Sequence, residues 1–196
     1  LAQFGNLYAL ESNDDAIALA NNRGITKVEK GSLPDNIPFG SKKFDLICMI
    51  DVLEHIDDDL ATLKTLHGLL KPNGKLLLTA PAYQFLWSHQ DEISQHKRRY
   101  TRGNLEPIIR NAGFSILYST YFNTIFFPIV LAVRTFKTAV RSLLGNTVEI
   151  YEGNDYNMPS KTMNRLLTEI FAFERHAIPK MPLPFGVSIM VIAQAD

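Results

Sequence analysis

The sequence has very little cysteine and tryptophan, with one residue of each among 196. A single cysteine, Cys48, excludes a disulfide framework within the chain and a cysteine-rich metal site. It suits a reducing, cytoplasmic setting, and no signal peptide is visible. The sequence also has no excess charge of either sign, because Lys+Arg and Asp+Glu both total 20. We therefore expect no nucleic-acid partner, since no global field attracts one.

Long hydrophobic runs are absent as well. The longest run, IFFPIVLAV, extends from Ile125 to Val133, whereas a membrane-spanning helix needs about 20 apolar residues. The sequence contains no internal repeat and no low-complexity tract. With 46% hydrophobic and 20% charged residues, it is typical of one globular domain with a sizeable core.

Apolar runs alternate with helical patterns along the chain. Residues 44–50 (FDLICMI) and 75–79 (KLLLT) form nearly continuous apolar runs, as strands of a parallel sheet do. Further strands are expected at 6–10, around Val28, at 114–122 and at 186–194, helices at 12–24, 58–70, 101–112, 124–144 and 161–174, and a turn at 71–74. The alternation predicts an α/β fold with a mostly parallel sheet. Its core is residues 1–123 and 185–196, with 124–184 as an appended helical lobe.

Polar residues follow the first two strands at their carboxyl ends, where ligands bind in open α/β sheets. Glu11 would either accept hydrogen bonds from a ribose diol or simply place its charge favourably before a helix. Ser32 and Leu33 would form either a turn that a flat ring approaches closely or an ordinary turn. The residues alone leave these alternatives open.

The third strand ends in IDVLEHIDDD, and its polar residues have different roles. Asp51, at the strand end, is best placed to face a ligand. The aspartates at 57–59 begin a helix, where they cap free N–H groups. His55 is either a general base or a structural hydrogen-bonding group. We expect no metal site here, because no recognised ligand spacing such as His-Glu-x-x-His occurs.

Two segments together, FDLICMIDVLEHIDD and LLKPNGKLLLTAP, resemble the middle of a class I S-adenosylmethionine-dependent methyltransferase. That family has an apolar strand ending near Leu-Glu-His, a helix, then Leu-Lys-Pro-x-Gly and a strand. The resemblance extends from Leu1 to about Phe122 and resumes at 186–194. It implies a Rossmann-like, seven-stranded sheet with an antiparallel last strand. It also implies S-adenosylmethionine as cofactor and methyl transfer to an oxygen or nitrogen of a small-molecule or lipid- or glycan-linked acceptor.

The resemblance assigns cofactor roles to particular residues. Glu11 matches the acid that holds the ribose hydroxyls, and Ser32 and Leu33 match the turn beside the adenine. Ile50 and Asp51 match the strand end beside the methionine portion. Relatives often have aspartate where Ser32 stands, so the contact to the adenine amino group departs from the family pattern or falls to a backbone group.

The glycine-rich loop of the family, of Gly-x-Gly-x-Gly type, should precede residue 1 and does not occur in this sequence. We therefore expect the first strand, that loop and most of the first helix to be missing. The 196-residue chain alone should then bind the cofactor weakly or not at all. Two other functions stay open. One is a non-catalytic binding or scaffold protein of the same fold. The other is a nicotinamide-dependent oxidoreductase, although the Tyr-x-x-x-Lys of short-chain members does not occur.

The segment AYQFLWSHQDEISQHKRRY, residues 82–100, should lie over the cleft where acceptors enter. His-x-Arg-Arg-Tyr segments are familiar in one branch of the family. The candidates for acceptor binding are three aromatic residues that would stack on a flat or sugar-like acceptor and two arginines that would clamp a phosphate or carboxylate: Tyr83, Trp87, Tyr100, Arg98 and Arg99. Alternatively, one arginine holds a carboxylate such as Asp91 or Glu92. His89 and His96 are candidate proton acceptors, and no other catalytic base is indicated.

The helix expected after Pro128 would place Arg134, Lys137 and Arg141 on one face and apolar residues on the other. Such a helix within 125–144 either contacts an anionic membrane surface or packs on the sheet or in a homodimer interface. A membrane contact would favour a lipid-linked acceptor.

Overall fold

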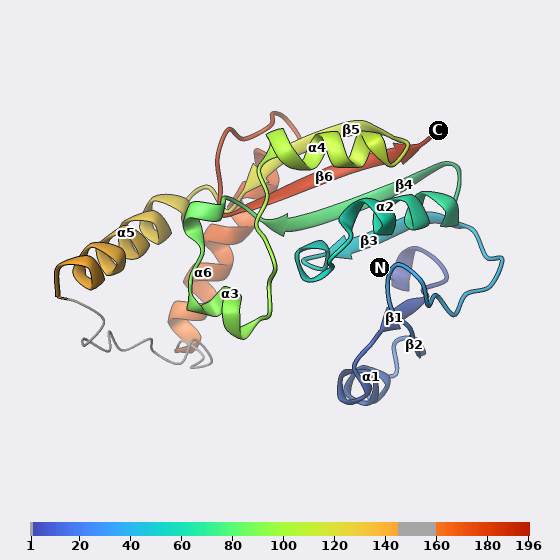
Figure 1. Ribbon diagram of the computed structural model, residues 1–196. Coiled ribbons are helices and arrows are strands. Elements are labelled where there is room, and N and C mark those ends of the chain that lie inside the picture. The colour runs from blue at the N-terminus through green and yellow to red at the C-terminus, as the bar shows by residue number, and fades with distance from the viewer. Residues whose placement is uncertain (1, 145–159) are drawn as a thin grey trace.

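The structure is a computed structural model that describes residues 2–144 and 160–196, without the side chains of 137–144 (Figure 1). The strands are β1 (Ala9–Glu11), β2 (Val28–Lys30), β3 (Phe44–Ile50), β4 (Leu70–Pro81), β5 (Phe114–Phe122) and β6 (Ser188–Ala195). The helices are α1 (Asp14–Asn21), α2 (Asp59–Leu69), α3 (His89–Ile93), α4 (Arg102–Asn111), α5 (Phe127–Leu144) and α6 (Lys161–Phe173). Short 3₁₀ turns include η2 (Leu53–His55), η3 (Gln84–Leu86) and η4 (Glu174–His176).

The described strands form two sheets. β1 pairs with β2 in parallel, with Glu11 opposite Lys30. The other sheet has the order β3-β4-β6-β5, in which β3 and β4 are parallel and β6 is antiparallel to both of its neighbours. The expected Rossmann-like α/β fold with an antiparallel last strand is therefore confirmed. Among the described residues the strands are divided between two sheets, whereas the resemblance implied a single continuous one.

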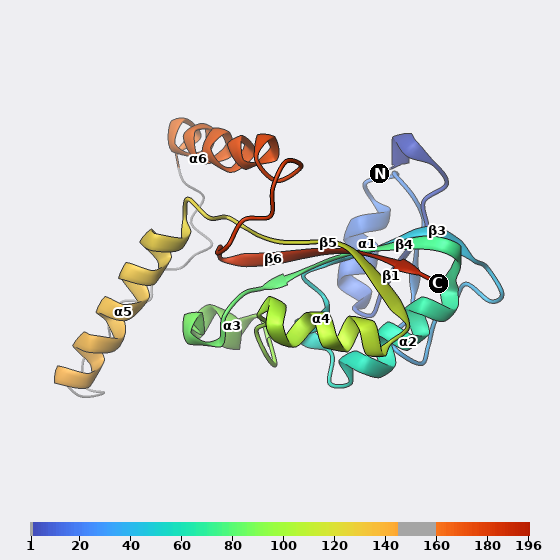
Figure 2. The same cartoon turned by 90° about the horizontal axis from the view of Figure 1, so that it is seen from above.

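The hydrophobic core lies on one face of the four-stranded sheet. Alternate residues of β6 are buried because successive side chains of a strand point to opposite faces. In Figure 2 the sheet is seen edge-on, with α2 and α4 on one side and α6 on the other. The fully buried leucines and isoleucines of this core are Leu53, Leu63, Leu76, Leu78, Leu105, Ile109 and Ile189. Each contributes roughly 1.5–3 kcal/mol of hydrophobic free energy.

The turn expected at residues 71–74 is instead part of β4. Phe44 pairs with Leu70, and Leu46 then pairs with Lys75, so the register shifts across the Pro-Asn-Gly segment. Asn73 has a φ of 62°, and a Cβ on Gly74 would lie 2.8 Å from the Lys71 carbonyl oxygen. Residues 71–74 do bend the chain, but β4 continues to pair with β3 on both sides of the bend.

Helices α5 and α6 lie between β5 and β6, where the helical lobe was expected. The buried Glu174 anchors this region, since its carboxylate accepts hydrogen bonds from the backbone N–H groups of Asn123 (2.6 Å) and Ile125 (3.1 Å). Within the described residues, no helix has both the length and the apolar character needed to cross a bilayer. Lys137 and Arg141 lie outside the residues whose side chains are described, so the basic face of this helix stays a prediction.

Candidate active site

Glu11 is the last residue of β1, and its carboxylate is held at the carboxyl edge of the small sheet. Its Oε1 accepts hydrogen bonds from the backbone N–H groups of Ser12 (2.7 Å) and Asn13 (3.0 Å). The Asn13 bond, together with those from Ser12, holds the pKa of Glu11 below its ordinary value, against the opposing effect of burial. The side chain is therefore a charged acceptor with a fixed orientation.

The turn after β2 lies directly beside Glu11. The N–H of Gly31 donates to the Glu11 carbonyl oxygen at 3.0 Å, and Ser32 and Asn36 exchange two backbone hydrogen bonds of 2.8 and 2.9 Å. A Cβ on Gly31 would lie 2.5 Å from the Asn36 carbonyl oxygen, so only glycine fits. The structure thus brings Glu11, Ser32 and Leu33 to one edge, although Leu33 also packs against the main core.

Asp51 follows β3 in a left-handed backbone conformation, with a φ of 51°. Its N–H donates to the carbonyl oxygen (3.2 Å) and the hydroxyl (3.1 Å) of Thr79 on β4, and the Thr79 hydroxyl donates to its carboxylate at 3.0 Å. Such a conformation is unfavourable for aspartate unless its surroundings impose it. These bonds fix Asp51 at the edge where β3 and β4 end, beside Ile50, which is 52% exposed.

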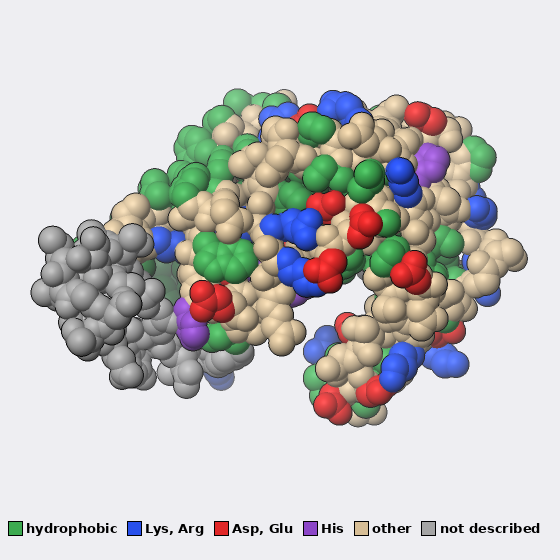
Figure 3. All heavy atoms as spheres, in the orientation of Figure 1, with side chains coloured by type: hydrophobic (Ala, Val, Ile, Leu, Met, Phe, Trp, Pro, Cys, Tyr) green, Lys and Arg blue, Asp and Glu red, His purple; other side chains and the backbone are tan. Residues whose placement is uncertain are grey.

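The two predicted halves of the cofactor site lie on different sheets. No hydrogen bond or ion pair between described residues joins Glu11, Ser32 or Leu33 to Ile50 or Asp51. The N-terminal unit, residues 2–43, contacts the rest through Leu33 and through aromatic rings, and Figure 3 shows an open notch between its lower part, around α1, and the rest of the molecule. A separate shallow hollow lies at the amino ends of β1 and β2, away from Glu11, and is lined by Ala2, Gly5, Asn6, Leu7, Tyr8, Thr26, Lys27 and Glu29.

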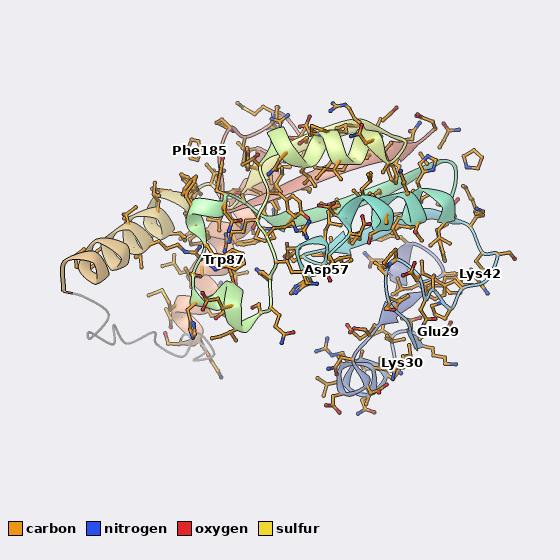
Figure 4. The ribbon with its side chains drawn as sticks, viewed as in Figure 1. Glu29, Lys30, Lys42, Asp57, Trp87 and Phe185 are labelled. Atoms are coloured by element: carbon orange, nitrogen blue, oxygen red, sulfur yellow. The ribbon has the colours of Figure 1, made fainter. Side chains whose placement is uncertain are left out.

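Arg98 and Tyr100 connect the loops that follow β3 and β4. The Arg98 guanidinium donates to the Asp57 carbonyl oxygen (2.8 Å) and the Asp59 carboxylate (3.2 Å). The Tyr100 ring is buried in the core, and its hydroxyl donates to Asp59 at 3.2 Å. In Figure 4, Asp57 lies on the loop after β3 and Trp87 on the segment after β4. The ring of Tyr100 is therefore occupied in the interior, and we leave it out of the proposed acceptor site.

Arg99 and Asp91 form a buried ion pair. Arg99 Nε lies 2.7 Å and Nη2 3.0 Å from the two carboxylate oxygens of Asp91, and Nη1 donates to the Ala82 carbonyl oxygen. Burial would raise the pKa of Asp91, but the hydrogen bonds from Arg99 and His96 outweigh it and lower the pKa. This matches the alternative in which one arginine holds Asp91, and we leave Arg99 out of the acceptor site as well.

The remaining candidates for acceptor binding lie on the segment between β4 and α3. Tyr83 stacks between Tyr121 and Phe85, with ring centroids 5.0 Å apart in both pairs. Phe85, which the sequence reasoning missed, exposes most of its side chain on the same segment. Trp87 is partly buried, and His89 is about half exposed and pairs with Glu92 at 3.2 Å.

The structure also brings together Glu54, His55 and His96, which the sequence did not indicate as a group. Glu54 is fully buried, and burial raises its pKa to about 7. Burial and the neighbouring His96 lower the pKa of His55. Both histidine-containing segments follow strands of one sheet, and this is the only sequence feature that could have indicated the group. The backbone hydrogen bond from the Lys97 N–H to the Glu54 carbonyl oxygen joins the two segments, and no local sequence pattern predicts it.

These features define a class of α/β protein. An oriented carboxylate follows its first described strand, and polar residues lie at the carboxyl ends of its strands. Proteins that bind nucleotide-like cofactors have this arrangement. The chain belongs to the methyltransferase domain family, whose model matches residues 2–119. The expected enzyme class, an S-adenosylmethionine-dependent methyltransferase, is thereby confirmed. No curated protein matches the chain.

Solved structures of methyltransferases share this fold. A Haloferax volcanii protein in complex with the Trm112 methyltransferase activator aligns with a TM-score of 0.58 and 13% identity over 96% of this chain and 71% of that one. A SAM-dependent methyltransferase from Archaeoglobus fulgidus aligns with a TM-score of 0.55 and 16% identity, over 95% of this chain and 75% of that one. Haemonchus contortus phosphoethanolamine N-methyltransferase 2, in complex with S-adenosyl-L-methionine, aligns with a TM-score of 0.54 and 16% identity. The alignment covers 96% of this chain and 43% of that one. At these identities the likeness shows the fold.

Proposed function

We propose that the protein transfers the methyl group of S-adenosylmethionine to an oxygen or nitrogen of a small-molecule or lipid- or glycan-linked acceptor. The observation that carries the proposal is the oriented Glu11 carboxylate beside the close-approach turn at Gly31. Glu11 would accept hydrogen bonds from the ribose hydroxyls, and Ser32 and Leu33 would lie beside the adenine. Ile50 and Asp51 would face the methionine portion.

The cofactor supplies the sulfonium methyl group, and the contribution of the chain is to bind and orient the two reactants. In-line methyl transfer depends mainly on proximity and orientation, and a base is needed only where the acceptor must lose a proton. Tyr83, Trp87 and Arg98 are the proposed acceptor contacts, since the Arg98 side chain is 36% exposed although it donates to Asp57 and Asp59, whereas that of Arg99 is 6% exposed. His89 is the more accessible candidate base, because its side chain is 51% exposed whereas that of His96 is 17% exposed.

The cofactor assignment is tested by the substitution Glu11→Gln in the full-length protein. The variant keeps the shape of the side chain but loses a charge-assisted hydrogen bond, worth about 1.5–3 kcal/mol. Titration calorimetry with S-adenosylmethionine should show an affinity reduced at least tenfold. Glu29→Gln, in the middle of β2 and lining the separate shallow hollow, is the matched control. Equal affinity in Glu11→Gln and the unsubstituted protein would refute the assignment.

The acceptor is identified by incubating the full-length protein with labelled S-adenosylmethionine and a panel of metabolites and glycolipids. Transfer to an oxygen or nitrogen of one panel member is the expected result. Transfer only to carbon or sulfur would contradict the proposed chemistry, and no transfer despite cofactor binding would favour the scaffold alternative. Catalysed oxidation of a reduced nicotinamide cofactor would favour the alternative of an oxidoreductase.

Exposed apolar side chains of the helical region favour an acceptor at a membrane surface. Ile129, Val133 and Phe136 on α5 are all exposed, Phe136 by 70%. Hydrophobic side chains also gather around Phe185, near the start of α5 (Figures 3 and 4). An amphipathic helix of this kind inserts its apolar face at the lipid interface. On this proposal the protein is cytoplasmic and peripheral to the membrane.

Co-sedimentation with anionic vesicles tests the membrane contact. Phe136→Asp should reduce the bound fraction severalfold, because a charge replaces an exposed apolar ring. Phe4→Asp, a similarly exposed ring on the N-terminal unit, should not. Replacing Arg134, Lys137 and Arg141 with glutamate should abolish binding. Unchanged sedimentation would count against the proposal, and loss of a dimer in gel filtration would assign the surface to a homodimer instead.

A further inference from the structure

Glu54, His55 and His96 converge from two loops on one small region. Glu54 and His55 belong to η2 after β3, and His96 lies between α3 and α4. One ligand atom from each side chain lies within 4.8 Å of the others. The backbone bond from Lys97 N–H to Glu54 O, 2.8 Å long, fixes the two loops relative to each other.

Neither oxygen of the Glu54 carboxylate has a hydrogen-bond partner on another described residue, although the residue is 0% exposed. The nearest ionisable nitrogen, His96 Nε2, is 3.9 Å from Oε1, beyond hydrogen-bond distance. Burying a carboxylate without partners is costly, and native proteins rarely leave one unsatisfied. Its own backbone N–H and Arg99 favour the charged form of Glu54, whereas burial, Asp51 and Asp91 disfavour it and together raise its pKa to about 7. The site therefore lacks a positive group at its centre.

His96 is oriented by a carboxylate on its other side. Its Nδ1 lies 2.9 Å from Asp91 Oδ1, and Asp91 is itself held by Arg99 at 2.7 Å. If Nδ1 carries the proton and donates it to Asp91, Nε2 directs its lone pair toward Glu54. Metal-binding histidines are characteristically held in this way, with one ring nitrogen on a carboxylate and the other on the ion. The His55 ring meets the His96 ring edge-on, with centroids 4.7 Å apart.

We propose that Glu54, His55 and His96 bind a divalent transition-metal ion, with Asp91 as the carboxylate that orients His96. Two histidines and one carboxylate are a donor set found in zinc sites that keep a fourth position open, and in non-haem iron sites. Two ligands of a tetrahedral zinc ion lie about 3.4 Å apart, so the separation of 4.8 Å has to close by about 1.4 Å at most. Rotation of the His55 and His96 side chains would have to supply this movement, because Glu54 is fully buried. The proposal does not depend on methyl transfer.

Titration of zinc chloride into the chelator-treated full-length protein tests the site. Calorimetry should show one zinc ion per chain with micromolar or tighter affinity. Glu54→Gln and His96→Gln should each weaken binding more than tenfold, while His176→Gln, on η4 outside the cluster, should not. Circular dichroism confirms that each variant folds. Absence of stoichiometric binding in the unsubstituted protein, or undiminished affinity in Glu54→Gln and His96→Gln, would overturn the proposal.

Cobalt(II) provides a readout that needs no variant. In the unsubstituted protein it should give the intense visible absorption of a four- or five-coordinate site, and zinc should abolish that absorption by competition. Weak absorption typical of a hydrated octahedral ion would show that any binding is at the surface, and would equally overturn the proposal.

Discussion

Arg99 and Asp91 show how strongly one buried charge depends on another. Each carboxylate oxygen of Asp91 accepts from a different nitrogen of Arg99, and the Ala82 carbonyl oxygen accepts a further bond. Such a bidentate pair is stable in the interior because nearly every polar atom has a partner. Removal of either residue would leave the other buried without its counter-charge, with only the weaker bonds from His96 and Ser88 to Asp91 or from Arg99 to Ala82.

We predict that Arg99→Met lowers the free energy of unfolding by about 3–5 kcal/mol, because the buried Asp91 loses its bidentate counter-charge and keeps only its hydrogen bonds with His96 and Ser88. Urea denaturation followed by circular dichroism at pH 7 measures the change. Arg110→Met removes a guanidinium that is 54% exposed and pairs with Glu106, and should cost less than about 1 kcal/mol. Equal losses in the two variants would contradict the interpretation of Arg99.

Glu106 gives a pH-dependent prediction. Burial acts to raise its pKa, but hydrogen bonds from Ser119, Arg102 and Arg110 outweigh burial and place the pKa below the ordinary value of 4.5. A lowered pKa in the folded state stabilises the protein above the unfolded value, and this stabilisation is lost as pH falls through the folded pKa.

Accordingly, Glu106→Gln should lower the free energy of unfolding by about 1 kcal/mol at pH 7, and this difference should shrink steadily below pH 4.5. Urea denaturation of both proteins between pH 3 and pH 7 measures it. Glu169→Gln, on the exposed face of α6, should show no difference at any pH. A difference for Glu106→Gln that persists unchanged at pH 3 would contradict the assignment.

At the scale of elements, the strands with clear local patterns could be predicted to the residue. β3 and β5 match 44–50 and 114–122 because each is a mostly apolar or aromatic segment bounded by polar or turn residues. The helix at α3 was missed, since its five residues show no apolar period and depend on a capping box in which the Asp91 carboxylate accepts a hydrogen bond from the Ser88 backbone N–H. The turn at 71–74 was wrong because strand pairing is a tertiary interaction that local residues do not encode.

Substitution of two glycines by alanine tests how tightly the elements pack, and we predict opposite effects on the free energy of unfolding. A Cβ on Gly186, before β6, would lie 2.1 Å from the Phe122 carbonyl oxygen at the end of β5. Gly186→Ala should therefore lower the free energy of unfolding by about 2 kcal/mol or more. Gly68 lies within α2, where an added Cβ would meet no other atom within 4 Å, so Gly68→Ala should raise it by about 0.5–1 kcal/mol. Urea midpoints that shift in the same direction would contradict this contrast.

At the scale of the whole molecule, the proposed cofactor site is divided between two sheets. Glu11, Ser32 and Leu33 belong to the N-terminal unit, and Ile50 and Asp51 belong to the four-stranded sheet. The sequence could place these residues at strand ends because that rule is local. It could not place Glu54 beside His96, because 42 positions separate them and only the meeting of two loops brings them together. The Arg99–Asp91 pair was foreseen only as an alternative, for the same reason.

The N-terminal unit is joined to the larger sheet partly through aromatic rings. Tyr8 and Phe39 meet Phe44, the first residue of β3, with centroid separations of 5.6 and 5.5 Å. Among the described strands no ladder of hydrogen bonds runs between β1 and β3. Each strand of the small sheet has three residues, and none of them is fully buried. Such a unit opens locally at a lower free energy than the core.

We therefore predict that amides of β1 and β2 exchange with deuterium much faster than those of β4 and β6 when the full-length protein is free of cofactor. S-adenosylmethionine at about 100 times its dissociation constant should slow exchange in β1 and β2, because the ligand would contact both sheets. The free energy of local opening of these strands should rise by up to about 2.7 kcal/mol. Hydrogen-exchange mass spectrometry measures the effect at peptide resolution. In Glu11→Gln, the same cofactor concentration should protect β1 and β2 less, because the ribose contact is weakened. Protection confined to β4 and β6, with no change at β1 and β2, would show that the cofactor does not bridge the two sheets.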